Sequence, residues 1–135
     1  MREMQDNFHK PTIMIVDDER NFTESLEFAI DDEYTVSVAG SLASARQALK
    51  SFQPDAILLD LRLPDGDGLE LFQDLKKLAK LPAVIVMTAY ASTESHIKTL
   101  GEGGVGYFVK PLNIEKLKQE LKKNIEEKNT LRELR

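Results

Sequence analysis

Acidic side chains stand where two apolar runs of the sequence stop. The run 12–16 is followed at once by Asp17 and Asp18, and the run 56–59 leads directly into Asp60. Short apolar runs bounded by turn-forming residues are typical of strands that are covered on both faces. Ligands of open α/β sheets bind at the carboxyl ends of such strands, so these acids are candidate metal ligands or nucleophiles.

Two more polar residues follow the remaining apolar runs. Thr88 comes directly after the run 83–87, and Lys110 comes directly after the run 107–109. In a parallel sheet the hydroxyl and the ammonium group would lie at the same edge as the acids. Alternatively, these residues could be solvated charges in loops. The placement of every one of them at a strand end argues against that interpretation. Thr88 and Tyr107, taken alone, could equally serve packing.

The chemistry that these groups permit is phosphoryl transfer to a carboxylate. Three carboxylates at one edge repel one another, and a divalent cation relieves that repulsion. Oxygen ligands without imidazole or thiolate favour Mg²⁺, and the sequence contains no cysteine and two histidines, His9 and His96. With Lys110 and Thr88 nearby, Asp60 is suited to attack phosphorus, because such transfer depends on positioning and charge neutralisation. The sequence lacks a Walker-type glycine-rich loop, so another protein or a small phosphorylated metabolite is the expected donor.

The elements that must position these residues alternate along the chain. Apolar residues at helical spacing, with Ser41 and Asn113 as N-caps, predict helices at 21–30, from Leu42 to just before Pro54, at 69–78, at 93–101 and from Ile114 onwards. Strands are expected at 12–16, 34–38, 56–60, 83–88 and 107–109.

Five strands that alternate with five helices predict a parallel sheet with right-handed crossovers and helices on both faces. The fold class is therefore α/β, a flavodoxin-like (βα)5 three-layer sandwich with strand order 2-1-3-4-5, in which neighbouring strands lie about 4.8 Å apart. The segment 34–38 alternates apolar and polar residues, which indicates a strand with one wetter face at the sheet edge. The helix at 93–101 has the weakest apolar stripe and leads into four glycines within six positions, which predicts local mobility.

Length and composition indicate one globular domain. The chain has 135 residues, of which 41% are hydrophobic and 30% charged. A net charge of -5 gives no electrostatic reason to bind nucleic acid directly. We expect a flexible leader at 1–11, a folded domain at 12–126, and at 127–135 an extension of the last helix that could serve as a linker. The start of the chain lacks a secretory signal and no stretch is long enough to span a membrane, so the expected location is the cytoplasm.

Four motifs in order give the chain a resemblance to a known family. They are the acidic pair Asp17–Asp18, the segment 58–68 (LLDLRLPDGDG), the segment 87–89 (MTA) and the segment 107–111 (YFVKP). From about Thr12 to Ile125 the chain resembles CheY-like receiver domains of bacterial two-component response regulators. The residues of these motifs and the last helix are similar to those in receivers of enhancer-binding (NtrC-type) transcription activators.

The resemblance implies a role for each acid at the predicted edge. Asp60 would be the phosphoacceptor, and Asp17, Asp18 and the backbone carbonyl of Arg62 would hold Mg²⁺ beside it. The phosphoryl group would come from a sensor histidine kinase or a phosphotransfer protein. The domain would catalyse its own phosphorylation and dephosphorylation and would not be an enzyme with a separate substrate.

The resemblance also implies a switch. Thr88 and Lys110 would grip the phosphoryl oxygens, with Lys110 and Pro111 joined by a cis peptide. Thr88 would move toward the phosphoryl group and Tyr107 would turn inward. These movements would change the face formed by the fourth helix, the fifth strand and the fifth helix, which would control an output such as transcription. Homodimers could form through that face or through the C-terminal helix.

Other functions remain open from the sequence. The chain could act as a stand-alone CheY-like regulator. It could also be a magnesium-dependent phosphatase or phosphotransferase with Asp60 as nucleophile, but such enzymes need an acid two residues later, where Arg62 stands and cannot protonate a leaving group. A flavodoxin-like cofactor carrier is disfavoured, because the loop after the first strand is acidic where a flavin phosphate needs hydrogen-bond donors.

Overall fold

The structure, a computed structural model, describes residues 10–78, 80–89 and 105–133. The predicted helix at 93–101, its predicted mobility and both histidines lie outside these residues. Of the predicted leader, the described part is Lys10 and Pro11.

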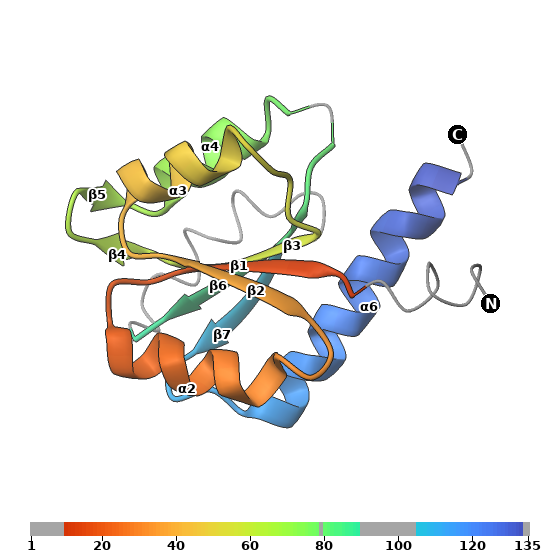
Figure 1. The fold of residues 1–135 in the computed structure, drawn as a ribbon, viewed down its shortest axis with the longest axis horizontal. Coiled ribbons are helices and arrows are strands. Elements are labelled where there is room, and N and C mark those ends of the chain that lie inside the picture. Colours follow the sequence, from red (N-terminus) through yellow and green to blue (C-terminus); the bar gives the residue numbers. More distant parts are fainter. Residues whose placement is uncertain (1–9, 79, 90–104, 134–135) are drawn as a thin grey trace.

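A five-stranded parallel sheet forms the centre of the molecule (Figure 1). Its order is β2-β1-β3-β6-β7, which confirms the predicted order 2-1-3-4-5. Every residue of β3 and β6 is buried, because helices cover both faces of these central strands. The strands are β1 (Thr12–Val16), β2 (Thr35–Ala39), β3 (Ala56–Asp60), β6 (Ala83–Thr88) and β7 (Val105–Val109).

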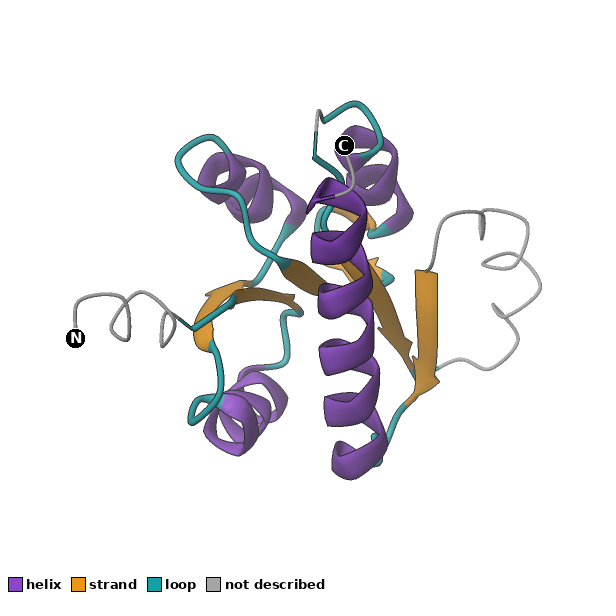
Figure 2. Cartoon of the chain, turned by 90° about the vertical axis from the view of Figure 1, so that its right-hand side faces the viewer, coloured by secondary structure: helices purple, strands orange, loops and turns teal. Residues whose placement is uncertain are grey.

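Helices cover the sheet in two layers. Helices α2 (Arg20–Ile30) and α6 (Ile114–Glu133) lie on one face, and α3 (Leu42–Leu49) and α4 (Leu69–Leu75) lie on the other (Figures 1 and 2). The flavodoxin-like sandwich is therefore confirmed. Two short strands, β4 (Arg62–Leu63) and β5 (Gly66–Asp67), form an antiparallel hairpin in the loop after β3.

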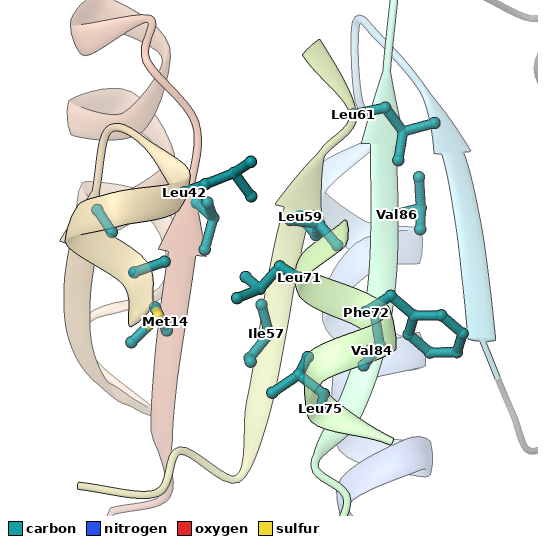
Figure 3. Close-up of a cluster of buried hydrophobic side chains, with 13 residues drawn as sticks. Met14, Leu42, Ile57, Leu59, Leu61, Leu71, Phe72, Leu75, Val84 and Val86 are labelled. Atoms are coloured by element: carbon teal, nitrogen blue, oxygen red, sulfur yellow. The ribbon is translucent and has the colours of Figure 1, made fainter. Parts of the chain in front are cut away.

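Each layer has its own hydrophobic core, because successive residues of a strand point to opposite faces. In the first cluster Ile57 and Leu59 of β3 pack with Leu71 and Leu75 of α4 (Figure 3). The second cluster contains Leu58 of β3 and lies under α2 and α6. Its helical members are Leu26, Ile30, Leu117, Leu121 and Ile125.

Both predicted N-caps are confirmed. The Ser41 hydroxyl accepts a hydrogen bond from the Ser44 N–H at 3.0 Å, and the Ser44 Oγ accepts one from the Ser41 N–H at 3.1 Å, which completes a capping box. The Asn113 Oδ1 accepts a hydrogen bond from the Lys116 N–H at 3.1 Å at the start of α6. These caps satisfy backbone donors that the first turn of a helix leaves without a partner.

Two helices end earlier than predicted. α3 ends at Leu49, and Phe52 packs against the first cluster from a turn in which its N–H bonds to the Ala48 carbonyl at 3.3 Å. α4 ends at Leu75, after which N–H groups bond to carbonyls three residues back, as in the Leu78 to Leu75 bond of 3.0 Å. These tighter turns rotate the chain off the α-helical stripe, so Leu78 is 37% exposed rather than inward-facing.

Strand β2 occupies the sheet edge as predicted, but the burial of its side chains does not follow the predicted alternation. Val36 packs half-buried against the second cluster, whereas Val38 is 46% exposed. Ser37, predicted to be on the wetter face, is half-buried, and its Oγ has no hydrogen-bond partner among the described residues. Val38 is exposed because it borders an open groove between the end of β2 and α2.

Candidate functional site

The predicted acids meet at the carboxyl edge of the sheet. β1 and β3 pair in parallel from Ile13 with Ala56 to Val16 with Leu59, so both strands end at the same level. Asp17 follows β1 and Asp60 ends β3. Carboxylate oxygens of Asp17, Asp18 and Asp60 lie within 4.8 Å of one another. The sequence therefore placed these three side chains correctly.

The three acids differ in their surroundings. Asp17 is 2% exposed and Asp60 is 8% exposed, whereas Asp18 is exposed to solvent. Asp17 is fixed through its Oδ1, which accepts a hydrogen bond from the Glu19 N–H at 2.9 Å. The pocket is therefore closed on the side of Asp17 and Asp60, and it is open to solvent on the side of Asp18.

The charge in this pocket is not fully balanced. Burial raises the pKa of the Asp60 carboxyl, and the nearby charge of Asp17 raises it further. The charge and hydrogen bond of Lys110 and a hydrogen bond of 3.3 Å from the Arg62 N–H act in the opposite direction but do not cancel the rise. A site with this excess of negative charge and oxygen ligands alone suits a hard divalent cation.

Lys110 supplies the positive charge of the cluster. Its Nζ lies 2.6 Å from Asp17 Oδ2, 3.4 Å from Asp60 Oδ2 and 4.0 Å from a carboxylate oxygen of Glu19. Burial works to lower the pKa of Lys110, but the hydrogen bonds and charges of Asp17 and Asp60 outweigh burial, so the pKa is raised. The group is therefore a fixed cation at neutral pH.

The end of β7 determines where Lys110 lies. Its backbone N–H donates to the Thr88 carbonyl at 2.7 Å, which continues the pairing of β6 with β7 by one residue. The Lys110–Pro111 peptide is cis, as predicted. The lysine side chain thus starts beside β6 and reaches across to the acids on β1 and β3.

Thr88 and Tyr107 occupy neighbouring strands on the same side of Asp60. Thr88 is the last residue of β6 and is fully buried. Asp60 pairs with Met87, so Thr88 lies one residue further along the adjacent strand. Tyr107, which pairs with Val86, is half-buried and packs against the first cluster. The structure thus gives the pocket a hydroxyl-bearing residue next to the strand of Asp60.

The loop after β3 folds tightly against the site. A Cβ on Gly68 would lie 2.2 Å from the Asp60 carbonyl oxygen, and the Gly68 N–H donates to the Leu61 carbonyl at 2.8 Å. Gly66 has a φ of 153°, a conformation that side chains rarely adopt. Both glycines are thus needed to bring the loop back over the strand end.

Asp65 anchors the tip of this loop, a role that the sequence did not reveal. Its Oδ1 accepts a hydrogen bond from the Leu42 N–H at 2.8 Å, and its Oδ2 accepts one from the Ala43 N–H at 2.9 Å. These bonds lower the pKa of the Asp65 carboxyl. A cap that comes from 23 residues away leaves no local signal, because N-cap patterns are read from adjacent residues.

An open groove of about 450 Å³ adjoins the acids. It runs between the first turns of α2 and the end of β2, and its walls carry both acidic and apolar side chains. The lining residues are Asp17, Asp18, Arg20, Thr23, Glu24, Glu27, Val38 and Gly40.

Comparison with known proteins identifies the class. Residues 13–122 match the response regulator receiver domain family, and the chain belongs to that family. It is thus a receiver domain of the two-component type, in which a response regulator interacts with a histidine kinase or a phosphotransfer protein. Receiver domains are in general not enzymes that turn over a separate substrate.

The curated relatives are longer proteins. The transcriptional regulatory protein KdpE of Staphylococcus aureus is 33% identical over 111 residues, which cover 82% of this chain and 48% of the relative. The DNA-binding transcriptional regulator NtrC of Proteus hauseri is 35% identical over 107 residues, which cover 78% of this chain and 23% of the relative. The chain thus spans half or less of the length of these relatives.

Solved structures agree with the fold. A CheY-like receiver domain protein from Methanospirillum hungatei superimposes with a TM-score of 0.82 at 28% identity, covering 90% of this chain and 98% of the other. The receiver domain of a putative LuxO repressor from Vibrio parahaemolyticus gives a TM-score of 0.83 at 23% identity, covering 93% of this chain and 97% of the other, and supports the fold alone.

Across the described parts of the chain, every helix is too short or too polar to cross a bilayer.

Proposed function

We propose that Asp60 is the phosphoacceptor of this receiver domain. The observation that carries the proposal is the cluster at the sheet edge, where the Asp60 carboxylate lies 3.4 Å from the Lys110 ammonium group and beside Asp17 and Asp18. Asp60 ends a fully buried strand, so its carboxylate faces the pocket with little freedom to turn away. A carboxylate held in this way is preorganised for attack on one incoming group.

The reaction forms one bond and breaks another. An oxygen of Asp60 attacks phosphorus, the bond between phosphorus and the donor breaks, and the donor leaves with the electron pair and takes up a proton. Lys110 neutralises charge on the phosphoryl oxygens, and the Thr88 hydroxyl donates to them. Asp17, Asp18, Asp60 and the backbone carbonyl of Arg62 would hold Mg²⁺, which supplies further positive charge to the transferring group.

The donor is a sensor histidine kinase or a phosphotransfer protein, and small phosphorylated compounds can replace it. The domain contributes to its own phosphorylation and dephosphorylation through the same residues, without turning over a separate substrate. The cytoplasm is the compartment in which such partners would meet it.

Phosphorylation switches the predicted face of the fourth helix, β7 and α6, of which the structure describes β7 and α6. Thr88 moves toward the phosphoryl group, and Tyr107 turns inward. The support is their position: Thr88 ends β6 beside Asp60, and Tyr107 lies on the next strand, in β7. A new charge at Asp60 then favours one of two arrangements of this face.

The folded receiver corresponds to residues 12–126, with 127–135 as a connector to an output. KdpE and NtrC are described as transcriptional regulators, which supports control of transcription as the output. The connector or the switched face would also allow homodimers to form. A stand-alone regulator that signals through the same face is the second candidate.

The test is intact mass spectrometry after incubation with Mg²⁺ and acetyl phosphate. One labile phosphoryl group per chain is expected, and it should be absent from Asp60→Asn. Asp55→Asn is the matched control, because Asp55 lies before the other end of β3, where its Oδ2 accepts a hydrogen bond from the Thr12 N–H at 2.8 Å. Label that survives in Asp60→Asn, or multiple turnover of a phosphomonoester, would contradict the proposal.

A further inference from the structure

The aromatic ring of Phe22 lies against the ammonium group of Lys110. The Lys110 Nζ is 4.2 Å from the centroid of the ring, well within the distance at which a cation is attracted to an aromatic face. Phe22 is in the first turn of α2, which starts four residues after β1 ends. The helix therefore brings the ring to the same edge as the acids.

Packing holds the ring in this place. Phe22, Leu26 and Ile30 form the apolar stripe of α2, and Leu26 and Ile30 are buried in the second cluster. Phe22 is the member of the stripe closest to the site, and it is half-buried against the same cluster. One side of the ring is thus anchored in the core while the ring also meets the lysine.

The ammonium group has two kinds of neighbour. Asp17 and Asp60 hold it by charge at 2.6 and 3.4 Å, and Phe22 holds it through the electron-rich face of the ring. A carboxylate that binds Mg²⁺ is a weaker partner for the lysine, because the cation competes for the same oxygens. A hydrocarbon ring does not bind Mg²⁺, so its contact with the ammonium group is independent of the metal.

We propose that Phe22 is a positioning residue for phosphoryl transfer, which keeps the Lys110 ammonium group beside Asp60 when Asp17 is engaged with Mg²⁺. The inference rests on the proposed function of Asp60. Lysine has a flexible four-carbon stem, and without the ring its head group would sample more positions away from the pocket. Fixing the head group before reaction lowers the entropy cost of the transition state.

A second lysine–aromatic pair provides a matched control. Phe72 lies in α4, and Lys76 is the C-cap of that helix. The Lys76 Nζ is 5.6 Å from the centroid of the Phe72 ring. Phe72 is 3% exposed in the first cluster, so Phe72→Leu removes a ring from the core without touching the acids. The two Phe→Leu variants therefore separate loss of packing from loss of lysine positioning.

The experiment measures the rate of phosphorylation by acetyl phosphate at saturating Mg²⁺. Phe22→Leu should be slower by about threefold to tenfold, which matches the usual strength of a partly buried cation–π contact. Phe22→Tyr, which keeps the ring, should restore the rate. Phe72→Leu should keep the wild-type rate even though it loses stability. In a Lys110→Ala background, Phe22→Leu should cause no further loss, because Phe22 acts through the lysine.

Nuclear magnetic resonance gives a second measurement that does not depend on phosphorylation. The ring current of Phe22 should shift the Lys110 Hε protons upfield in the wild type and in Phe22→Tyr, and the shift should disappear in Phe22→Leu. A wild-type rate in Phe22→Leu, a rate in Phe22→Tyr as low as in Phe22→Leu, or an equal loss in the Lys110→Ala background would overturn the inference alone. A wild type that takes up no phosphoryl group would overturn the proposed function together with the inference.

Discussion

Asp60 and Asp65 are five residues apart in one segment, yet their surroundings act on them in opposite directions. Burial and the charge of Asp17 raise the pKa of Asp60. Backbone N–H groups of Leu42 and Ala43 lower the pKa of Asp65. Ionisation of Asp60 therefore destabilises the folded state, whereas ionisation of Asp65 stabilises it.

The difference shows how one short loop divides structural and chemical tasks. Asp65 gives its charge to the start of α3, where backbone donors and the helix dipole stabilise a negative group. Asp60 keeps a charge that its neighbours do not fully compensate, so it gains from a cation or a phosphoryl group. The hydrogen bonds of Asp65 thus hold the loop in place while the site around Asp60 binds its ligands.

Gly68 packs the end of the loop that carries Asp65 against the backbone of Asp60. Changing it should have the largest effect on stability. Gly68→Ala should lower the free energy of unfolding by about 3 kcal/mol, because the new Cβ would lie 2.2 Å from the Asp60 carbonyl oxygen. Urea denaturation measures the change. Gly40→Ala is the control, since its nearest neighbour would be the Asp18 Cα at 4.0 Å, and its change should stay below about 0.5 kcal/mol. Equal effects of the two variants would show that the loop does not pack against Asp60 in this way.

Magnesium should act on the Asp60 region and leave the Asp65 region unaffected. At a concentration of ten times its dissociation constant, Mg²⁺ should stabilise the wild type by about 1.4 kcal/mol. Asp18→Asn should lose most of this gain, because it removes a proposed ligand that is exposed and makes a small contribution to the fold. Asp65→Asn should keep the gain. Thermal denaturation with and without Mg²⁺ measures both, and a full response in Asp18→Asn would contradict the assignment of that ligand.

The two aspartates should change stability with opposite sign when Mg²⁺ is absent. Asp60→Asn should raise the free energy of unfolding at neutral pH, and this gain should shrink as the pH falls through the raised pKa toward about 3.9, where the carboxyl is protonated in both states. Asp65→Asn should lower stability at neutral pH, because the pKa of Asp65 is lowered in the folded state. That loss should vanish only below about pH 3.9, as Asp65 becomes protonated. Urea denaturation in EDTA from pH 3 to 8 checks both, and parallel pH profiles would refute the contrast.

The smallest effect is expected at Ser41. Ser41→Ala removes one side of the capping box and should cost about 0.5 kcal/mol, at the low end for an N-cap, because Asp65 still accepts two hydrogen bonds from the first turn of α3. Combined with Asp65→Ala, the loss should exceed the sum of the single changes, since the helix then lacks both caps. Strict additivity in urea denaturation would mean that the two caps act independently.

The sequence predicted the sheet well because its strands are buried runs with sharp ends. Continuous apolar segments such as 56–59 admit few other structures, and alternation with helices restricts the order of the strands. The meeting of Asp17, Asp18 and Asp60 then follows from parallel strands that end at one level. Helix ends were predicted less well, because Leu78 continues the stripe of α4 in sequence while the backbone changes to tighter turns.

Features that depend on distant contacts left no sequence signal. The cap that Asp65 provides joins residues 23 apart, and the contact of Phe22 with Lys110 joins residues that the fold brings together from α2 and the end of β7. Val38 was expected to face inward with Val36, but whether a neighbouring helix covers it depends on how far α2 extends over β2. Such contacts are decided by the packing of whole elements.

Helix α6 is long enough to amplify a small movement of the sheet. It has 20 residues and is therefore about 30 Å long, and among its described side chains Ile125 is the last one that is buried against the sheet. The eight residues from Glu126 to Glu133 continue the helix beyond Ile125 for about 12 Å. A tilt of about 10° over the full helix would swing its far end by about 5 Å, so a small adjustment near the strands becomes a displacement that an attached partner can sense.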